Sequence, residues 1–231
     1  RKIFTAKRRP ATNPLIVHVE GAEQARRIAA SWPEQATKLI DAFWPGPLTL
    51  VLPKHTSALD DSVLLVPDEA TAGRPNVALR VPAHPVALAL IERAGVPICA
   101  PSANLYMSVS PTRAEHVLDS ELADAVQFVL DAGPTRVGVE STVLSLLDGE
   151  PPVILRHGMI TRSEIQAALG GERVYLLEEF QALQGDRNAD ASLSPEQDEP
   201  RGALSPGMAA RHYAPRAPMT IADVMAPAMH E

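Results

Sequence analysis

Short apolar runs and longer mixed stretches alternate along the chain. The short runs are rich in branched residues and bounded by turn residues, as buried strands are. They predict strands over 15–19, 48–52, 76–81, 96–100, 126–131, 142–147 and 153–156. The longer stretches predict helices over 22–30, 33–43, 84–94, 112–119 and 162–169. Because strands and helices do not alternate strictly, the pattern predicts an α/β domain with a twisted mixed sheet flanked by helices.

Two predicted helices carry a capping signal at their start. Thr161 and Glu164 have the spacing of a capping box, in which each residue satisfies a backbone amide of the other. Thr112 and Glu115 have the same spacing. The second pair predicts a helix that begins at Pro111 or just after it.

Polar groups gather near the ends of two predicted strands. Three cations at 7–9 precede the strand that carries His18. The run Pro-Ser-Ala-Asn at 101–104 follows another strand, and Ser110 stands just before the helix predicted from Pro111. Ligands of open α/β sheets bind past strand ends, and cations and free helix amides attract phosphate. Together the segments predict an anion site, although each alone also fits ordinary turn and surface chemistry.

Composition narrows the class of protein. Hydrophobic residues make up 45% of the 231 residues and charged residues 21%, as in soluble globular proteins. No apolar run approaches the roughly 18 residues that span a bilayer, so no membrane role is expected. Cys99 is the only cysteine, which excludes disulfides within the chain and fits a reducing cytoplasm. We therefore expect a cytoplasmic protein.

The sequence offers no compact metal or phosphate motif. The seven histidines show no pair at metal-ligand spacing, so no protein metal ligand is assigned. Neither a P-loop nor a Gly-x-Gly-x-x-Gly run is present. If ATP binds, separate basic and hydroxyl groups must hold it.

The negative charge of the chain is concentrated near its C-terminal end. Residues 1–177 carry a net charge of −2, whereas 178–199 carry −6 of the formal total of −7. Residues 181–204 combine these charges with many polar residues and predict a flexible linker. Overall acidity argues against a broad nucleic-acid surface, and the basic residues at 1–9 are the local exception.

A series of motifs then resembles one family. They are Lys7 and Arg9 with Asn-Pro-Leu-Ile-Val-His at 13–18, Phe-Trp-Pro-Gly-Pro-Leu-Thr at 43–49, Leu-Arg-Val-Pro at 79–82, Ser102 with Asn104, Val-Glu-Ser-Thr-Val at 139–143, Ile-Leu-Arg at 154–156, Ser-Pro-Gly-Met at 205–208 and His-Tyr-Ala-Pro at 212–215. In this order they resemble the Sua5/YrdC/YciO family over nearly the whole chain. The last two motifs resemble the segment that joins the two domains of the long Sua5 form.

The resemblance implies a fold and a reaction. Members have the YrdC-like α/β fold with a large open cleft. They make threonylcarbamoyl-AMP, which supplies the N6-threonylcarbamoyl group of adenosine 37 in transfer RNAs that decode ANN codons. The substrates are L-threonine, bicarbonate or CO2, and ATP. The threonine carbamate attacks the α-phosphate and pyrophosphate leaves, with Mg2+ expected to bridge the phosphates and no protein nucleophile required. Downstream threonylcarbamoyl-transferase proteins receive the product.

By the same resemblance, individual residues fall at ligand positions. The nucleotide positions are Lys7, Arg9, Asn13, Ser102, Asn104, Ser110, Arg156 and Tyr213. The threonine positions are His18, Arg80, Ala100 and Ser141. Arg80 suits the amino-acid carboxylate because a guanidinium can donate two parallel hydrogen bonds to it. Without the family, Arg80 and Arg156 would be interpreted as surface cations, Ser141 as a buried hydroxyl and Tyr213 as a packing aromatic.

The resemblance also predicts a division of the chain. A YrdC-like catalytic domain would cover 1–177, an acidic linker 178–216, and the start of a C-terminal Sua5 domain 217–231. The family's opening strand and helix, which help to bind threonine, would lie before Arg1, so this sequence is expected to be a fragment of a longer synthetase.

Four positions depart from the family pattern. Arg8 stands where glycine is usual, Asn76 where threonine is frequent, Tyr106-Met107 in place of Ser-Gly, and His157 in place of proline. Two other hypotheses stay open, and the departures are the main support for the first of them. A non-catalytic nucleotide-binding relative would keep the ATP groups without the reaction. An RNA-binding module would use the basic residues at 1–9 and bind RNA in a strongly salt-dependent way.

Overall fold

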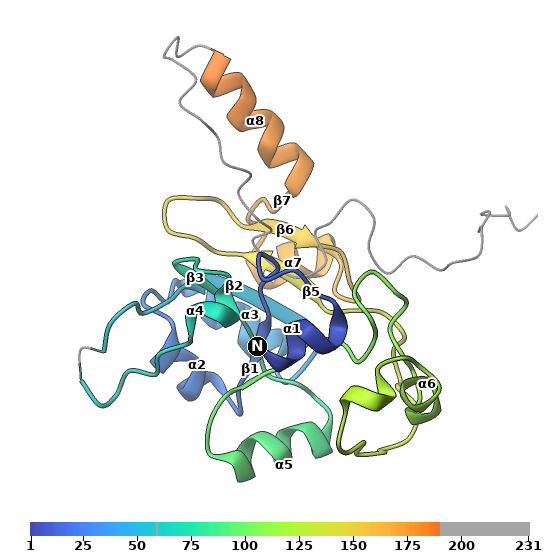
Figure 1. Cartoon of the computed structure of the whole chain (residues 1–231). Coiled ribbons are helices and arrows are strands. Elements are labelled where there is room, and N and C mark those ends of the chain that lie inside the picture. The colour runs from blue at the N-terminus through green and yellow to red at the C-terminus, as the bar shows by residue number, and fades with distance from the viewer. Residues whose placement is uncertain (59, 190–231) are drawn as a thin grey trace, which may run out of the picture.

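A single mixed sheet runs through the part of the chain that the computed structural model describes, residues 1–58 and 60–189 (Figure 1). Its strands are β1 (Ile16–His18), β2 (Leu48–Pro53), β3 (Asn76–Arg80), β4 (Ile98–Cys99), β5 (Thr142–Ser145), β6 (Val153–Arg156) and β7 (Tyr175–Leu176). The helices are α1 (Lys2–Lys7), α2 (Ala22–Ile28), α3 (Glu34–Phe43), α4 (Asp68–Thr71), α5 (Pro85–Ala94), α6 (Ala114–Leu118), α7 (Arg162–Ala168) and α8 (Leu177–Ala189), with a 3-10 turn at Ala123–Ala125.

The strand order of the sheet is β4-β1-β3-β2-β5-β6-β7. Neighbouring pairs alternate between antiparallel and parallel: β1 is parallel to β3, β2 to β5 and β6 to β7, whereas the other three pairs are antiparallel. This arrangement confirms the predicted α/β class with a mixed sheet flanked by helices.

The central strand β2 shows how the sheet is buried on both faces. Leu48, Leu50 and Leu52 point to one face, where they join a core cluster that includes residues of α2, α3 and α7. Val51 points to the other face and packs with a smaller cluster. All four side chains are fully buried. A strand covered on both sides needs an almost continuous apolar run, and 48–52 provides one that is broken only by Thr49, whose buried hydroxyl contacts that of Ser141.

Four helices follow the sequence prediction closely. α2, α3, α5 and α7 begin and end within two residues of the predicted bounds. α7 begins with the expected capping box, because the Thr161 hydroxyl accepts from the Glu164 amide and the Glu164 carboxylate accepts from the Thr161 amide. α5 ends at Gly95, whose φ of 66° lies in the left-handed region that glycine adopts without penalty.

Two predictions between 110 and 131 are wrong: the strand over 126–131, and the capped start of the helix over 112–119, which itself is present as α6. No strand forms over 126–131, where Phe128 is 87% exposed, because the segment lies beside no strand of the sheet and its backbone has no ladder partner. The helix expected from Pro111 begins only at Ala114. The Thr112 amide donates to Nδ1 of His116 at 3.2 Å. This hydrogen bond replaces the one that the predicted capping box would have made to Glu115.

Several elements have no counterpart in the prediction. No element was predicted at α1, α4 or β7, and most of α8 lies in the segment expected to be a flexible linker. The predicted strands at 15–19, 96–100 and 142–147 are shorter at one or both ends. α8 occupies 177–189, so the first part of the segment expected to be linker is helical, and it extends from β7 at the top of the view in Figure 1. The rest of that linker lies outside the described residues.

Strand register brings two predicted ligand residues together. β1 and β3 are parallel neighbours, and His18 at the end of β1 is paired in register with Arg80 at the end of β3. Residues paired in register on adjacent strands point to the same face of a sheet. β4 lies on the other side of β1, and the Ala100 amide that follows it donates to the carbonyl of Ile16 at 3.1 Å. His18 of β1, Arg80 of β3 and Ala100 after β4 therefore lie close together, and they form the floor of a candidate site.

Candidate functional site

A cavity of about 210 Å³ opens over this floor. It is lined by Arg9, Ile16, His18, Arg80, Ala100, Pro101, Ser102, Glu140 and Arg156. Six of these residues were predicted as ligand positions, three from the nucleotide set and three from the threonine set. The structure therefore brings members of both sets to a single cavity, although they come from five separate regions of the sequence.

Arg80 is positioned by the loop after α3. Its Nε donates to the carbonyl of Gly46 at 3.0 Å, which fixes the guanidinium plane while the side chain lines the cavity. Burial lowers the pKa of Arg80, and the charge of Glu140 opposes that effect. An arginine side chain stays protonated in proteins even so, and the cavity therefore keeps a fixed positive charge at the end of β3.

His18 is a neutral imidazole at the floor of the cavity. Burial lowers its pKa from 6.5 to about 4, and the positive charge of Arg80 acts in the same direction. Hydrogen bonding to the backbone of Ile98 and Ile16 opposes that shift only in part, and the ring as a whole lines the cavity.

The depressed pKa of His18 predicts a pH-dependent stability. Between about pH 6.5 and pH 4 the unfolded chain binds a proton that the folded chain does not, so stability falls as the pH falls through this window. From pH 7 to pH 5 the expected loss is about 2 kcal/mol. Urea unfolding at both pH values measures it. His18→Gln should reduce the difference, the matched exposed variant His157→Gln should keep it, and an unchanged slope in His18→Gln would contradict the assignment.

Arg9 and Asn13 form a buried pair beside the cavity. The Nη2 atom of Arg9 donates to Oδ1 of Asn13 at 2.6 Å and to the carbonyl of Pro14 at 2.6 Å. Arg9 also lies over the ring of Tyr106, with 5.8 Å between its Cζ and the ring centroid. Asn13 is buried and does not line the cavity. Its role in this structure is to orient the Arg9 guanidinium through the hydrogen bond at Oδ1.

Lys7 holds the loop that follows β4. Its ammonium donates to the backbone carbonyls of Ser102, at 2.5 Å, and Asn104. The Asn104 side chain in turn donates to the carbonyls of Leu105 and Ser108, at 2.9 and 2.7 Å. Burial, followed by the charge of Arg9, lowers the pKa of Lys7 to about 8. The Lys-x-Arg and Ser-x-Asn motifs are thus parts of one hydrogen-bonded unit that presents Ser102 to the cavity.

Arg156 and Ser141 connect β6 to the start of β5. The Arg156 guanidinium donates to the Ser141 carbonyl at 2.9 and 3.1 Å and to its hydroxyl at 3.0 Å. The Ser141 hydroxyl also contacts that of Thr49 at 2.8 Å, and the residue is 1% exposed. Ser141 therefore lies behind Arg156 in this structure, whereas Arg156 lines the cavity.

Ser110 is not at a helix end, contrary to the prediction. Its hydroxyl donates to Oε1 of Glu140 at 2.6 Å, and α6 begins four residues later. Glu140 is a cavity residue that the sequence prediction missed. The available signal was its place in the Val-Glu-Ser-Thr-Val motif, but a single glutamate before a strand resembles an ordinary solvated residue.

The basic residues at 1–9 do not form one exposed patch. Lys7 and Arg9 are buried. Arg1 pairs with Glu69 at 3.2 Å and Arg8 with Glu121 at 2.8 Å. The surface that the RNA-binding hypothesis requires is therefore divided among separate contacts.

The described residues contain no group of three or more His, Cys, Asp or Glu side chains that could hold a metal ion. Mg2+ commonly takes most of its ligands from water and substrate phosphates and few from protein. Within the same part of the chain, no helix has the length and apolar character to cross a bilayer.

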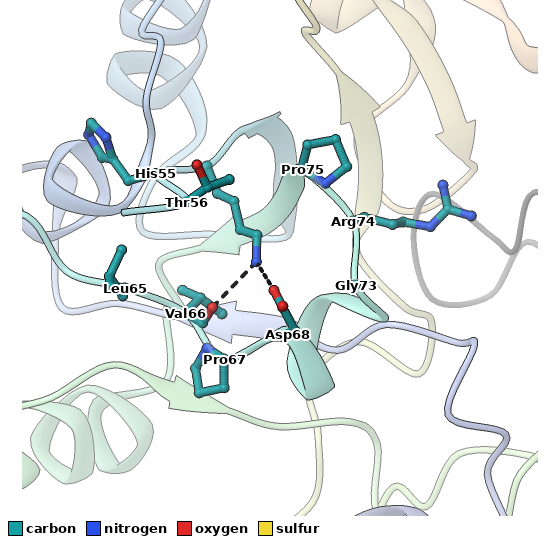
Figure 2. Close-up of a pocket in the computed structure, with 10 residues that line it drawn as sticks. His55, Thr56, Leu65, Val66, Pro67, Asp68, Gly73, Arg74 and Pro75 are labelled. Atoms are coloured by element: carbon teal, nitrogen blue, oxygen red, sulfur yellow. Dashed lines mark hydrogen bonds and ion pairs between the residues drawn. The ribbon is translucent and has the colours of Figure 1, made fainter. Parts of the chain in front are cut away.

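A second hollow lies away from the predicted ligand residues. The Lys54 ammonium donates to the carbonyl of Val66 at 3.4 Å and to the carboxylate of Asp68 at 2.8 Å. Figure 2 shows Val66 and Asp68 among the residues that line this hollow. This hollow of about 480 Å³ is larger than the first, but none of its lining residues was predicted as a ligand position. The buried charge of Lys54 is compensated by Asp68, so this contact accounts for it structurally.

Comparison with known proteins places the chain in a family. A family model named Sua5_yciO_yrdC, described as "Telomere recombination", matches residues 1–158. The chain belongs to the Sua5/YciO/YrdC family. A second model, described as "Threonylcarbamoyl-AMP synthase, C-terminal domain", matches 160–230. The division predicted near residue 177 remains a prediction.

Two curated relatives are similar to almost the whole chain. The threonylcarbamoyl-AMP synthase of Bacillus subtilis is 44% identical and that of Pyrococcus abyssi 42% identical, each over 96% of this chain. The chain spans 57% and 58% of the lengths of these Sua5-family relatives.

Solved structures of the family agree with the fold. The crystal structure of P. abyssi Sua5 complexed with L-threonine matches 94% of this chain and 56% of its own, with a TM-score of 0.73 and 42% identity. Escherichia coli YciO matches 71% of this chain and 75% of its own, with a TM-score of 0.60 and 22% identity, which supports the fold alone.

Proposed function

We propose that this chain contributes the ATP and L-threonine site of a threonylcarbamoyl-AMP synthase. The reaction joins L-threonine, bicarbonate or CO2, and ATP, and it releases pyrophosphate. Support comes from curated relatives of that name at 42% and 44% identity and from a Sua5 structure, 42% identical, described as complexed with L-threonine.

One observation carries the proposal. Arg9, Ser102 and Arg156 of the proposed nucleotide set line the same cavity as His18, Arg80 and Ala100 of the proposed threonine set. Two anionic substrates that must react with each other need adjacent cationic sites. The cavity offers three arginines and a neutral imidazole.

The residues divide into those that contact substrates and those that hold them in place. We assign ATP binding to Lys7, Arg9, Asn13, Ser102, Asn104, Ser110, Arg156 and Tyr213, and threonine binding to His18, Arg80, Ala100 and Ser141. The contacts of Lys7, Asn13, Asn104, Ser110 and Ser141 favour an indirect role for these five. Tyr213 lies outside the described residues.

The chemistry needs positioning and charge neutralisation and no covalent protein intermediate. Arg80 would hold the amino-acid carboxylate, and Arg9 and Arg156 would face phosphate oxygens where negative charge develops as pyrophosphate leaves. Mg2+ would enter with ATP and neutralise phosphate charge, held by phosphates and water. The cavity floor would set the distance between the threonine nitrogen and the nucleotide.

In the cell the product would serve transfer-RNA modification. We propose that downstream threonylcarbamoyl-transferase proteins receive threonylcarbamoyl-AMP for N6-threonylcarbamoyladenosine at position 37, in the cytoplasm. The buried Lys7 and the paired Arg1 and Arg8 support at most weak RNA binding by this chain.

Calorimetric titration tests the two ligand sites. MgATP and L-threonine should each bind the full-length natural protein that carries this sequence, and both should bind together at a one-to-one ratio. L-serine, which lacks the methyl group, serves as the matched control ligand and should bind more weakly. Mutually exclusive binding of ATP and threonine would contradict the proposal, because one cavity could then not bring them together.

A further inference from the structure

Glu140 is a carboxylate in a cavity that otherwise carries positive charge. It shares the cavity with three arginines, and its charge acts on Arg80 and Lys7. None of the ligand positions assigned above includes it. A negative charge at this place opposes the binding of ATP and of a carboxylate, so charge complementarity with these two anions does not account for it.

The structure holds this carboxylate in position. The Ser110 hydroxyl donates to its Oε1 atom at 2.6 Å from a loop 30 residues away in sequence. On the backbone side, Gly158 packs against the carbonyl of Glu140 so closely that a Cβ atom would lie 2.6 Å from it. Glu140 is therefore fixed between two segments, with its side chain at the cavity wall, as a residue that contacts a ligand would be.

One group among the proposed substrates is a cation. ATP and bicarbonate are anions, and threonine carries a single ammonium group beside its carboxylate. We propose, building on the proposed function, that Glu140 binds the ammonium group of the amino-acid substrate. Glu140 thereby selects amino acids over carboxylic acids that lack the amine.

The rest of the cavity provides the other two contacts of such a ligand. Arg80 is the cation for the carboxylate, and the imidazole of His18, which lines the same cavity, would bond the hydroxyl. Three contacts from β1, β3 and the loop before β5 would fix an amino acid in one orientation. The contact of Glu140 concerns the bound amino acid before its nitrogen reacts with bicarbonate or CO2.

The test compares two acids that differ only in the amino group, L-threonine and 3-hydroxybutyrate. Calorimetry on the full-length protein should show that Glu140→Gln weakens threonine binding by roughly 10- to 100-fold, as expected for a lost charged hydrogen bond. The affinity for 3-hydroxybutyrate should change less than about twofold. Binding of MgATP should be unchanged or tighter, because a negative charge has left the cavity. The control is Glu92→Gln, an exposed carboxylate on α5.

The outcomes separate the two proposals. Equal losses for both acids would overturn the inference and assign Glu140 a structural role at the Ser110 loop. A loss of MgATP affinity that depends on Mg2+ would overturn it in favour of a metal ligand. If the wild-type protein binds ATP but neither acid, the proposed function itself fails, and the inference fails with it.

Discussion

Replacing Arg80 with alanine is expected to weaken L-threonine binding by roughly 100-fold and ATP binding by less than about threefold. The side chain lies at the end of β3 with its Nε already bonded to Gly46, so the guanidinium is held in place before a ligand arrives. A charged hydrogen-bonded contact in a partly buried site typically contributes about 2–3 kcal/mol, which is roughly 30- to 150-fold in affinity. Calorimetry with each ligand separately measures both changes.

Arg80→Lys is the matched control for this prediction. Lysine keeps the charge but cannot donate two parallel hydrogen bonds to a carboxylate, so it should recover only part of the threonine affinity. Circular dichroism should show that both variants remain folded. Equal losses of threonine and ATP affinity in Arg80→Ala would contradict a specific contact with the amino acid. Arg80 would then have a structural role that both ligands depend on.

Replacing Gly158 with alanine is expected to destabilise the protein by about 3 kcal/mol or more. A Cβ atom at this position would lie 2.2 Å from the Thr142 amide nitrogen, 2.5 Å from the Ser141 carbonyl carbon and 2.6 Å from the Glu140 carbonyl oxygen. These are backbone atoms at the start of β5, and they cannot turn away as a side chain could. The strand must shift, and the Ser141 carbonyl that accepts from Arg156 shifts with it.

Thermal unfolding tests this prediction. For a chain of this size, a loss of 3 kcal/mol corresponds to a decrease of about 6–12 °C in Tm. Gly138→Ala is the control, because its Cβ would meet only a Thr112 methyl group at 3.8 Å, an ordinary contact. An unchanged Tm and unchanged ligand affinity in Gly158→Ala would contradict the prediction. Gly158 would then have more space beside the backbone of 140–142 than these distances indicate.

The sequence predicted elements best where burial is complete or a cap is local. β2 was predicted because four of the five residues at 48–52 are apolar, with Thr49 the exception, and both faces of the strand are covered. α7 was predicted because Thr161 and Glu164 satisfy one another within one turn. Both signals lie within a few residues of each other, so no tertiary information was needed.

The incorrect predictions concern segments whose structure depends on contacts with residues outside the local sequence pattern. The segment 126–131 has strand-forming residues, but a strand also needs a neighbour to take its backbone hydrogen bonds. At Thr112 a histidine four residues later competes for the backbone amide that the predicted capping box would have used. Short elements such as α4 and β7 carry too few residues for periodicity to be visible.

Two departures from the family pattern have a backbone explanation. Arg8 and Met107 stand where the family usually has glycine, and they adopt φ angles of 53° and 70°. Non-glycine residues are uncommon in this left-handed region, so the pattern reflects a conformation that the chain keeps even with other side chains. At these two positions the departures are therefore compatible with the backbone conformation that glycine would favour.

The candidate site could be predicted only as a set of motifs. Lys7 and Ser102 are 95 residues apart, and nothing in their spacing reveals that the ammonium of one donates to the carbonyl of the other. The family resemblance supplied the grouping, and strand register supplied the geometry that pairs His18 with Arg80. Glu140 was missed because its function depends on the three arginines around it and on no local feature.

Pyrophosphate release from ATP by the full-length natural protein tests the central claim most directly. We expect release that requires both L-threonine and bicarbonate, with threonylcarbamoyl-AMP detected by mass spectrometry in equal amount. Release should fall at least tenfold in Arg80→Ala at a fixed threonine concentration below saturation. Binding of ATP and threonine without any pyrophosphate or threonylcarbamoyl-AMP would exclude synthase activity and favour a non-catalytic nucleotide-binding relative.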